Sequence, residues 1–371
     1  MTNPLAVVST IMGIEPPPDQ ISAKEPAHVI DVELERGRHV VLEPADPRSA
    51  GFARVLDGLR TLRLPAYLEI DPATSAITRL LIPHATRVIG IRPITVGILS
   101  VELWPSHGQH LLRREEPGFV ELEGRLRDAV GSGEPLIVTE NDAHEIIDVR
   151  AYTPDPNAPP LPPLPKPELP RPRPLGRILE LLRRLWIWRA LWLWFRSVSE
   201  DRAQQAFDAV SATSCDPVTA PQPCIPFLYP DNGCWARAHE MCRLMIGSGL
   251  RPAKVWSQGA LWVSTKNHPD CMVMWPWHVA PTLHVRGPGF LEVRDMVIDP
   301  SLFEEPVSTE TWKGVQGDPN ATLTATDASI YLRDSMTDPS YTQTNLVLAM
   351  YRLELLNRVT MSGPPPYSNC A

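Results

Sequence analysis

Short apolar runs separated by Pro, Gly and Asp fill most of residues 27–150. Runs of this kind are typical of β-strands bounded by turns. The expected strands are 28–32, 40–42, 66–70, 76–82, 87–91, 98–104, 136–139 and 146–149. Two segments, 52–62 and 120–130, instead keep apolar residues at helical spacing. The pattern therefore predicts a small β-rich domain of α+β or β-barrel-like architecture, preceded by a flexible N-terminus at 1–26.

The histidines of this first domain show no spacing of metal ligands. They are His28, His39, His84, His107, His110 and His144. Dispersed histidines more often lie on the surface or pack in the core than bind a metal. We therefore expect no functional site in residues 27–150, whose role the pattern leaves unknown.

Prolines divide the chain into two halves. The sequence holds 42 of them, and they are densest between Pro154 and Pro174. A proline run cannot build a helix or an interior strand, so 151–174 is predicted to be an extended linker. The alternative is a ligand for a partner's aromatic groove, as PxxP segments often are.

A Trp- and Arg-rich amphipathic helix is predicted directly after the linker, at 175–197. Its apolar stripe runs from Ile178 to Phe195. A helix that crosses a bilayer needs about 20 apolar residues, and Arg183, Arg184 and Arg189 interrupt this one. The helix could lie in a membrane interface or contact a partner, or it could be clamped between the two domains.

The second domain, 198–371, is predicted to mix helices and strands. A helix follows Cys234, with Asp231 or Asn232 expected as its cap. Strands are expected at 254–256 and 260–263 as a pair, then at 272–285 and 290–298. A last helix, 345–359, is expected to pack behind this sheet. The tail after it is expected to be loose unless Cys370 forms a disulfide.

Cys234 is the residue around which a chemical site can be assembled. Gly233 permits a sharp bend before it, and a helix N-terminus favours the thiolate that acts as nucleophile. His278 and Asp299 follow in chain order, in Trp-Pro-Trp-His-Val-Ala-Pro and Ile-Asp-Pro-Ser-Leu-Phe. A thiol, a base and a carboxylate that orients the base are the minimum for thiol acyl chemistry.

Other residues compete for each of these roles. His284, His239 and His268 are alternatives to His278, and Asp295 is an alternative to Asp299. Cys234 could also be a buried structural thiol, as we expect of Cys242 and Cys271. A zinc site of Cys234, His239 and Cys242 has a spacing that fits no common zinc finger. Arg237 is expected to form a structural salt bridge or to bind carbonyl groups.

Composition excludes one class of function and leaves the compartment undecided. A net charge of −8 argues against general nucleic-acid binding. The first 20 residues lack a basic start and a long apolar run, so no secretory signal peptide is visible. The protein would then be cytoplasmic or exported by another route. Six cysteines are too few for a framework of disulfides, although a Cys215–Cys224 bridge could form.

The motifs around these three residues resemble those of the protein glutaminases. The resemblance is carried by Asp-Asn-Gly-Cys-Trp-Ala-Arg-Ala-His-Glu-Met at 231–241, Lys-Val-Trp at 254–256, and the two motifs that hold His278 and Asp299. It implies a papain- and transglutaminase-like α+β catalytic domain with Cys234 as nucleophile, His278 as base and Asp299 as orienting acid. It also implies deamidation of glutamine side chains in a protein substrate, with no metal and no cofactor. Known members are secreted with a pro-region; whether 27–150 acts as one is open.

Tryptophans are numerous enough near these motifs to form a slot for the apolar stem of glutamine. Trp235, Trp256 and Trp277 are the candidate substrate-binding residues. Most such tryptophans in proteins belong to the core. The alternatives for the function are transglutaminase or cysteine protease chemistry, or a non-catalytic protein that binds a membrane or a partner through 151–197.

Overall fold

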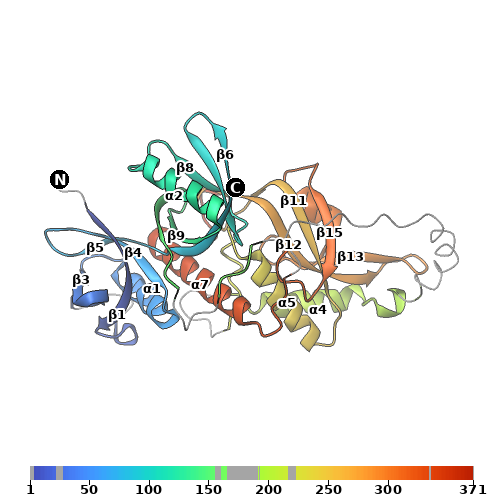
Figure 1. Cartoon of the computed structure of the whole chain (residues 1–371). Helices are drawn as coiled ribbons and strands as arrows, with labels where there is room; N and C mark the ends of the chain where they lie inside the picture. The colour runs from blue at the N-terminus through green and yellow to red at the C-terminus, as the bar shows by residue number, and fades with distance from the viewer. Residues whose placement is uncertain are drawn as a thin grey trace. The chain divides into compact units, whose positions relative to one another are not determined.

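The structure is a computed structural model of the whole chain (Figure 1). It describes residues 4–21, 28–154, 160–164, 191, 193–215, 223–333 and 336–370. The chain forms two compact units. We call Met1–Leu164 with Ala349–Ser368 the N-terminal unit, and Pro165–Cys215 with Ala220–Leu348 and Asn369–Ala371 the C-terminal unit. Each unit is described separately.

The N-terminal unit contains two five-stranded antiparallel sheets, each with one long helix between its strands. The first sheet has the order β3-β2-β1-β4-β5 and the second the order β8-β7-β6-β9-β10. The first is built from β1 (Leu5–Glu15), β2 (Ile30–Leu34), β3 (Arg38–Leu42), α1 (Ser49–Leu62), β4 (Pro65–Ile70) and β5 (Ile77–Leu81). The second is built from β6 (His84–Thr95), β7 (Ile98–Trp104), β8 (His110–Arg113), α2 (Phe119–Ser132), β9 (Pro135–Glu140) and β10 (Ile146–Ala151).

The two sheets repeat one topology. In each, a long first strand lies at the centre, a hairpin pairs with one side of it, and a second hairpin follows the helix on the other side. Even a lone parallel bridge recurs, Val41 to Ala76 in the first and Leu111 to Glu145 in the second. We call 5–81 the first module and 84–151 the second module. The unit is therefore a tandem repeat, and the β-barrel-like alternative is wrong.

The central strand of the first module lies where the sequence suggested a flexible N-terminus. β1 pairs with both β2 and β4. Ile11 and Ile14 are buried in the module's core. The prediction of flexibility at 1–26 is therefore wrong for Leu5–Glu15, because these residues complete the sheet.

The last long helix, α7 (Thr342–Ser362), does not pack as predicted. From Ala349 onward its residues belong to the N-terminal unit. Leu353 and Leu356 join the core of the first module, and Asn357 Nδ2 donates to the carbonyl oxygen of Leu80 at 3.0 Å. The expectation that 345–359 packs behind the catalytic sheet is wrong for this stretch.

The C-terminal unit is organised on one antiparallel sheet with the order β14-β13-β12-β11-β15. Its elements are α4 (Glu200–Ser211), α5 (Cys234–Gly247), β11 (Ala253–Ser264), β12 (Met272–Arg286), β13 (Val293–Val297), β14 (Val307–Ser308), α6 (Thr309–Gly314) and β15 (Thr322–Asp327). The predicted strand pair at 254–263 is a single strand, β11, with an irregularity between Gln258 and Leu261. β12 pairs along most of its length with β11 and thereby forms the centre of the sheet.

Two disulfides close loops in the C-terminal unit. Cys215 bonds to Cys224, as the sequence allowed, and Cys271 bonds to Cys370. The second bond corrects one expectation, since Cys271 is not a free thiol, and it ties down the tail, as the sequence left open. Cys242 is a buried free cysteine, as predicted.

Most of the predicted linker and of the Trp/Arg-rich helix lies outside the described residues. In the linker, the described stretch 160–164 accepts a hydrogen bond from Trp104 Nε1 at the Pro163 carbonyl oxygen, at 2.7 Å. In the helix, 191 and 193–196 are helical. No helix among the described residues is long and apolar enough to cross a membrane.

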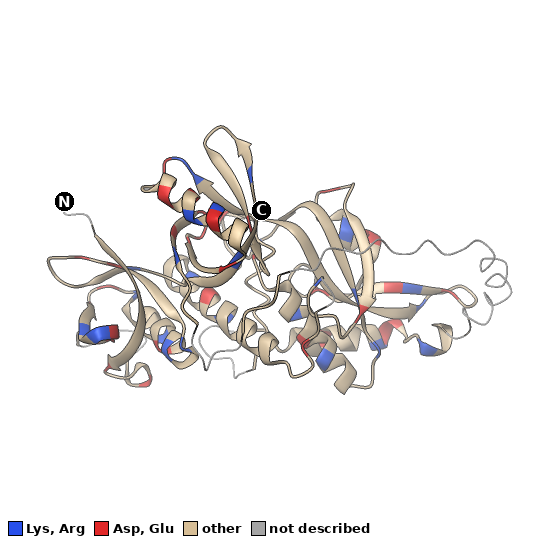
Figure 2. Cartoon of the chain, viewed as in Figure 1, with Lys and Arg blue, Asp and Glu red and all other residues tan. Residues whose placement is uncertain are grey.

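Charged residues of both signs are interspersed on the described elements, as on α2 (Figure 2). There Arg125 pairs with Glu121 and Arg127 with Glu123, each one helical turn apart. Such exposed pairs add a few tenths of a kcal/mol at most.

Candidate active site

The site begins at the N-terminus of α5, where Cys234 is the first helical residue. Gly233 precedes it with φ of 80°, a left-handed conformation that glycine adopts without strain. No side chain caps the helix, so the prediction of Asp231 or Asn232 as the cap is wrong. Instead, Asn232 Oδ1 accepts a hydrogen bond from the Gly233 N–H at 3.0 Å and stiffens the bend.

Arg237 holds the loop that leads into Cys234. Its Nη1 donates to the carbonyl oxygens of Tyr229, at 2.9 Å, and of Asn232. The side chain is buried. The prediction that Arg237 binds carbonyl groups is confirmed, and its positive charge lies near enough to favour the Cys234 thiolate.

His278 and Asp299 meet in the interior beside this helix. His278 projects from β12, and its Nε2 lies 2.8 Å from Asp299 Oδ2. Trp312 Nε1 donates to the same oxygen at 2.9 Å, and the Ser301 N–H donates to Oδ1 at 3.3 Å. Burial alone would raise the pKa of Asp299, but His278 and Trp312 outweigh it and hold the pKa below its usual value. Asp299 is therefore a carboxylate that fixes the direction of the imidazole.

Two tryptophan rings lie against the imidazole. Trp275 stacks on His278 with ring centroids 4.5 Å apart, and Trp312 with centroids 5.4 Å apart. Trp275 is held in turn by a hydrogen bond from Nε1 to the Asp231 carbonyl oxygen, at 3.1 Å. The ring of His278 thus has little freedom to rotate away from the cysteine loop.

The sulfur of Cys234 lies within 4.8 Å of a ring nitrogen of His278. Because Nε2 is bonded to Asp299, Nδ1 is the nitrogen available to exchange a proton with the sulfur. Burial raises the pKa of the thiol strongly, while Arg237 and the backbone N–H groups of Val279 and Trp235 lower it by less. The helix N-terminus therefore favours the thiolate as expected, but burial outweighs it and raises the pKa of the Cys234 thiol overall.

The competing histidines and aspartate have other partners. His284 pairs with Asp295 across β12 and β13, on the surface of the unit. His268 Nε2 lies 3.1 Å from Asp231 Oδ1. The geometry therefore brings together His278 and Asp299 with Cys234 and does not bring in the alternatives.

His239 contacts a buried lysine rather than a metal ligand set. Lys254 Nζ lies 2.9 Å from His239 Nδ1, and the Asp338 carbonyl oxygen lies 3.2 Å from Nε2. Burial lowers the pKa of Lys254 to about 8, and burial together with Lys254 lowers the pKa of His239 to about 4. Among the described residues, Cys234, His239 and Cys242 do not form a group that could hold a metal.

The predicted substrate-binding tryptophans form a buried cluster. Trp277 lies between the other two, with ring centroids 5.9 Å from Trp235 and 5.6 Å from Trp256. Trp235 Nε1 donates to the Tyr331 hydroxyl at 3.1 Å, and Trp256 Nε1 to Thr326 Oγ1 at 2.8 Å. Contact with a substrate stays a prediction; packing between α5 and the sheet is what the structure displays.

Sequence reasoning missed Trp312. The residue is fully buried on α6, and its role depends on where that short helix places the indole N–H. The signal that could have found it is a tryptophan directly after a Ser-Thr-Glu-Thr helix start, because a buried indole N–H needs an acceptor.

The comparison with known families decides the identity of this region. Residues 203–316 match the model of a family described as Glutaminase. The C-terminal unit therefore contains a glutaminase region, which supports deamidase activity. The matched glutaminase segment contains Cys234, His278, Asp299 and Trp312.

Solved structures show the same fold beyond the glutaminase segment. The crystal structure of a pro-protein-glutaminase is similar with a TM-score of 0.50 and 21% identity, over 78% of this chain and 99% of that one. A mutant of pro-protein-glutaminase gives a TM-score of 0.50 and 22% identity over the same shares. The NMR structure of protein-glutaminase from Chryseobacterium proteolyticum is 26% identical over 47% of this chain and 97% of that one, with a TM-score of 0.37. No curated protein matches the chain.

Proposed function

We propose that the enzyme hydrolyses the side-chain amide of protein-bound glutamine, giving glutamate and ammonia. The observation that carries this proposal is the approach of Cys234 Sγ to the imidazole of His278, itself bonded to Asp299, inside the glutaminase segment. The similar solved structures are titled protein-glutaminase, which supports a protein substrate.

The reaction begins from the Cys234 thiol, whose pKa is raised by burial. His278 Nδ1 takes the proton of Cys234 as the sulfur attacks the carboxamide carbon, so the thiolate need not exist beforehand. Asp299 and Trp312 stabilise the imidazolium that forms. His278 then gives the proton to departing ammonia, and a thioester remains on Cys234.

Water completes the cycle. His278 removes a proton from a water molecule that attacks the thioester carbon, and glutamate leaves as the sulfur regains its proton. We expect the Cys234 backbone N–H, at the start of α5, to donate a hydrogen bond to the negative charge that develops on the carbonyl oxygen. A lysine amine in place of water would give a crosslink, and a backbone amide in place of the carboxamide would give a cut chain.

The test is ammonia release from an unfolded glutamine-rich protein. The full chain is compared with Cys234→Ala and with Cys242→Ala, a matched change at the other buried free cysteine of the same helix. Ammonia that persists with Cys242→Ala and vanishes with Cys234→Ala supports the proposal. Crosslinked or cleaved substrate without ammonia would assign transglutaminase or protease chemistry instead, and ammonia from Cys234→Ala would remove the cysteine from the mechanism.

We further propose that the N-terminal unit restrains the enzyme. The observation favouring this is that the likeness to pro-protein-glutaminase covers 78% of the chain, against 47% for protein-glutaminase. A protease site placed at 165–170 would allow the two parts to be cut and separated. Faster ammonia release by the separated C-terminal fragment is expected, and an unchanged rate would refute the restraint.

A further inference from the structure

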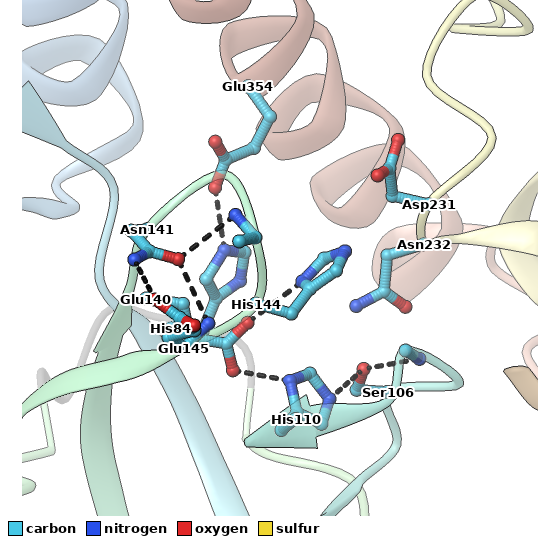
Figure 3. Close-up of polar contacts among 12 residues, drawn as sticks. His84, Ser106, His110, Glu140, Asn141, His144, Glu145, Asp231, Asn232 and Glu354 are labelled. Carbon is cyan, nitrogen blue, oxygen red and sulfur yellow. Dashed lines mark hydrogen bonds and ion pairs between the residues drawn. The ribbon is translucent and has the colours of Figure 1, made fainter. Parts of the chain in front are cut away.

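Three chemically reactive side chains meet in the second module, and none of them belongs to the Cys234, His278 and Asp299 site. His110 Nδ1 contacts Glu140 Oε1, and His144 Nδ1 lies 3.0 Å from Glu140 Oε2 (Figure 3). One ligand atom of each residue lies within 4.8 Å of the other two. The side chains are 3%, 12% and 20% exposed for His110, Glu140 and His144. We propose that His110, Glu140 and His144 bind one zinc ion.

The first module shows that the fold does not need these residues. The repeated parallel bridge, Val41 to Ala76 and Leu111 to Glu145, aligns the two modules. The residues before it are Val40 and Ser75 in the first module and His110 and His144 in the second. Likewise β4 ends at Ile70 and β9 at Glu140.

Hydrocarbon fills two of these positions in the first module, where Val40 and Ile70 are fully buried. Replacing them by an imidazole and a carboxylate loses hydrophobic burial and adds the desolvation of polar groups. The second module therefore carries the cluster at a cost to stability, as functional sites do.

The backbone delivers His144 to the cluster. His144 has φ of 57° in the turn between β9 and β10, and Ser75 has φ of 61° at the matching place. A left-handed conformation is uncommon for residues other than glycine, and histidine adopts it more often than most. Since the turn is shared by both modules, the new element in the second is the imidazole itself.

Ser106 can set the tautomer of His110 that a metal requires. Its Oγ lies 2.7 Å from His110 Nε2 and accepts a hydrogen bond from the Gly108 N–H at 3.1 Å. With Nε2–H donated to Ser106, the lone pair of His110 lies on Nδ1, which faces Glu140. A hydrogen bond on the second ring nitrogen is the usual support of a metal-binding histidine.

The spacing suits zinc. Zinc binds imidazole nitrogen at about 2.0–2.1 Å and carboxylate oxygen at about 2.0–2.2 Å, so two ligands of a tetrahedral ion lie roughly 3.3 Å apart. The His144–Glu140 distance of 3.0 Å needs to open by only a few tenths of an ångström. Two imidazoles and one carboxylate favour zinc over magnesium or calcium, which prefer oxygen ligands, and leave a fourth position for water. The ion would join the first residue of β8 and the last residue of β9 to the turn before β10.

The first module supplies the matched control. The variant His110→Val with Glu140→Ile and His144→Ser gives the second module the residues of the first at these positions. All proteins carry Cys234→Ala, because the cysteine and His278 could bind zinc themselves. A control variant carries His84→Gln, which changes a histidine that pairs with Glu354 and does not belong to the cluster.

Metal-stripped full-length proteins are titrated with Zn²⁺ in a calorimeter, with far-UV circular dichroism to confirm folding. We expect about one zinc ion per chain in the Cys234→Ala protein and with His84→Gln. We expect no zinc in the triple variant, and roughly 10-fold weaker binding with Ser106→Ala. The single change His144→Ala, expected to weaken binding about 100-fold or more, serves if the triple variant does not fold.

Three results would overturn the site. The first is the absence of zinc binding by the folded Cys234→Ala protein, which would mean that the three side chains are held together by hydrogen bonds without a metal. The second is equal zinc binding by the folded triple or His144→Ala variant. Labelling of Ser106 by a fluorophosphonate would also overturn it, because Ser106, His110 and Glu140 would then act as a hydrolase triad.

Discussion

At the scale of single residues, the site depends on the hydrogen bonds that hold its side chains in place. Asp299 is fixed from two sides, by His278 and by the indole of Trp312. A carboxylate with two donors on one oxygen cannot rotate without breaking both. The direction of the imidazole is therefore set in part by a tryptophan that is fully buried.

Trp312→Phe tests that arrangement. Phenylalanine keeps a ring against His278 but removes the donor to Asp299, a hydrogen bond to a charged group worth about 1.5–3 kcal/mol. We expect kcat for ammonia release to fall roughly 10- to 100-fold with little change in KM. Trp262→Phe is the control, since Trp262 is 47% exposed. Equal losses in both variants would mean that the indole N–H has no specific role.

His239 makes stability fall in mild acid. Its pKa is about 4 in the folded protein, below the ordinary 6.5, so the unfolded chain takes up the proton first. The free energy of unfolding should therefore fall as pH drops from about 6.5 to 4, by at most about 1.4 kcal/mol per pH unit. His239→Gln keeps an acceptor for Lys254 and a donor for Asp338, and should flatten this slope in urea titrations. The same slope in the variant would assign the acid sensitivity to other groups.

Prediction from sequence succeeded where chemistry follows chain order. Gly233 before Cys234, Arg237 on the next turn, and the order of His278 and Asp299 could all be read from the motifs. Trp312 could not, because its partner depends on the placement of α6. The His110–Glu140–His144 cluster was dismissed for lack of spacing, since strand pairing and a turn bring these residues together.

At the scale of elements, the close approach of α7 to α1 explains two glycines. A Cβ at Gly58 would lie 2.4 Å from Leu353 Cδ2, and one at Gly51 would lie 2.2 Å from Thr360 Oγ1. Both contacts are far shorter than van der Waals distance. The two helices can pack at this distance because α1 carries glycine at both positions.

Gly58→Ala should therefore destabilise the N-terminal unit, by about 1–3 kcal/mol for overpacking. Gly124→Ala on α2 is the matched control, because a Cβ there meets nothing within 4 Å. Replacing a helical glycine by alanine where the added Cβ meets no other atom should stabilise the folded protein by roughly 0.5–1 kcal/mol. Denaturant unfolding of both variants gives the sign, and a stabilised Gly58→Ala would contradict the packing.

Most strands and both helices of the modules followed from apolar periodicity, as at 98–104 and 52–62. β1 did not, because its pattern ends at Pro16-Pro17-Pro18 and resembles a loose terminus. The repeat itself was missed, because topology is shared between the modules while residues such as Val40 and His110 differ. The propensities of residues describe one strand at a time, whereas the order of strands in a sheet depends on pairing with strands that are distant in the sequence.

At the scale of the whole molecule, the two disulfides differ in the length of chain they close. Cys271 and Cys370 are 99 residues apart in the sequence, and Cys215 and Cys224 are 9 apart. In the chain-entropy account, the longer loop contributes about 4.7 kcal/mol and the shorter roughly 2.6 kcal/mol.

Cys370→Ser should accordingly lower the free energy of unfolding more than Cys224→Ser, by roughly 2 kcal/mol. The comparison is made by denaturant unfolding without reductant. Reduction of both disulfides in the wild-type protein should lower the free energy of unfolding more than either single substitution does. A larger effect of Cys224→Ser would show that local strain, rather than loop length, governs these bonds.

The same long disulfide has a consequence for maturation. The chain leaves the C-terminal unit at Ala349, contributes Leu353 and Leu356 to the core of the first module, and returns at Asn369 beside the bonded Cys370. A protease that cuts the linker would thus produce a nicked complex. In it, the amino-terminal fragment still packs against Ala349–Ser368, a segment of the carboxyl-terminal fragment within the loop that the disulfide closes. Release of the amino-terminal fragment would require local unfolding of this contact or digestion of that fragment. Cutting of the linker and activation would then be separate events in time.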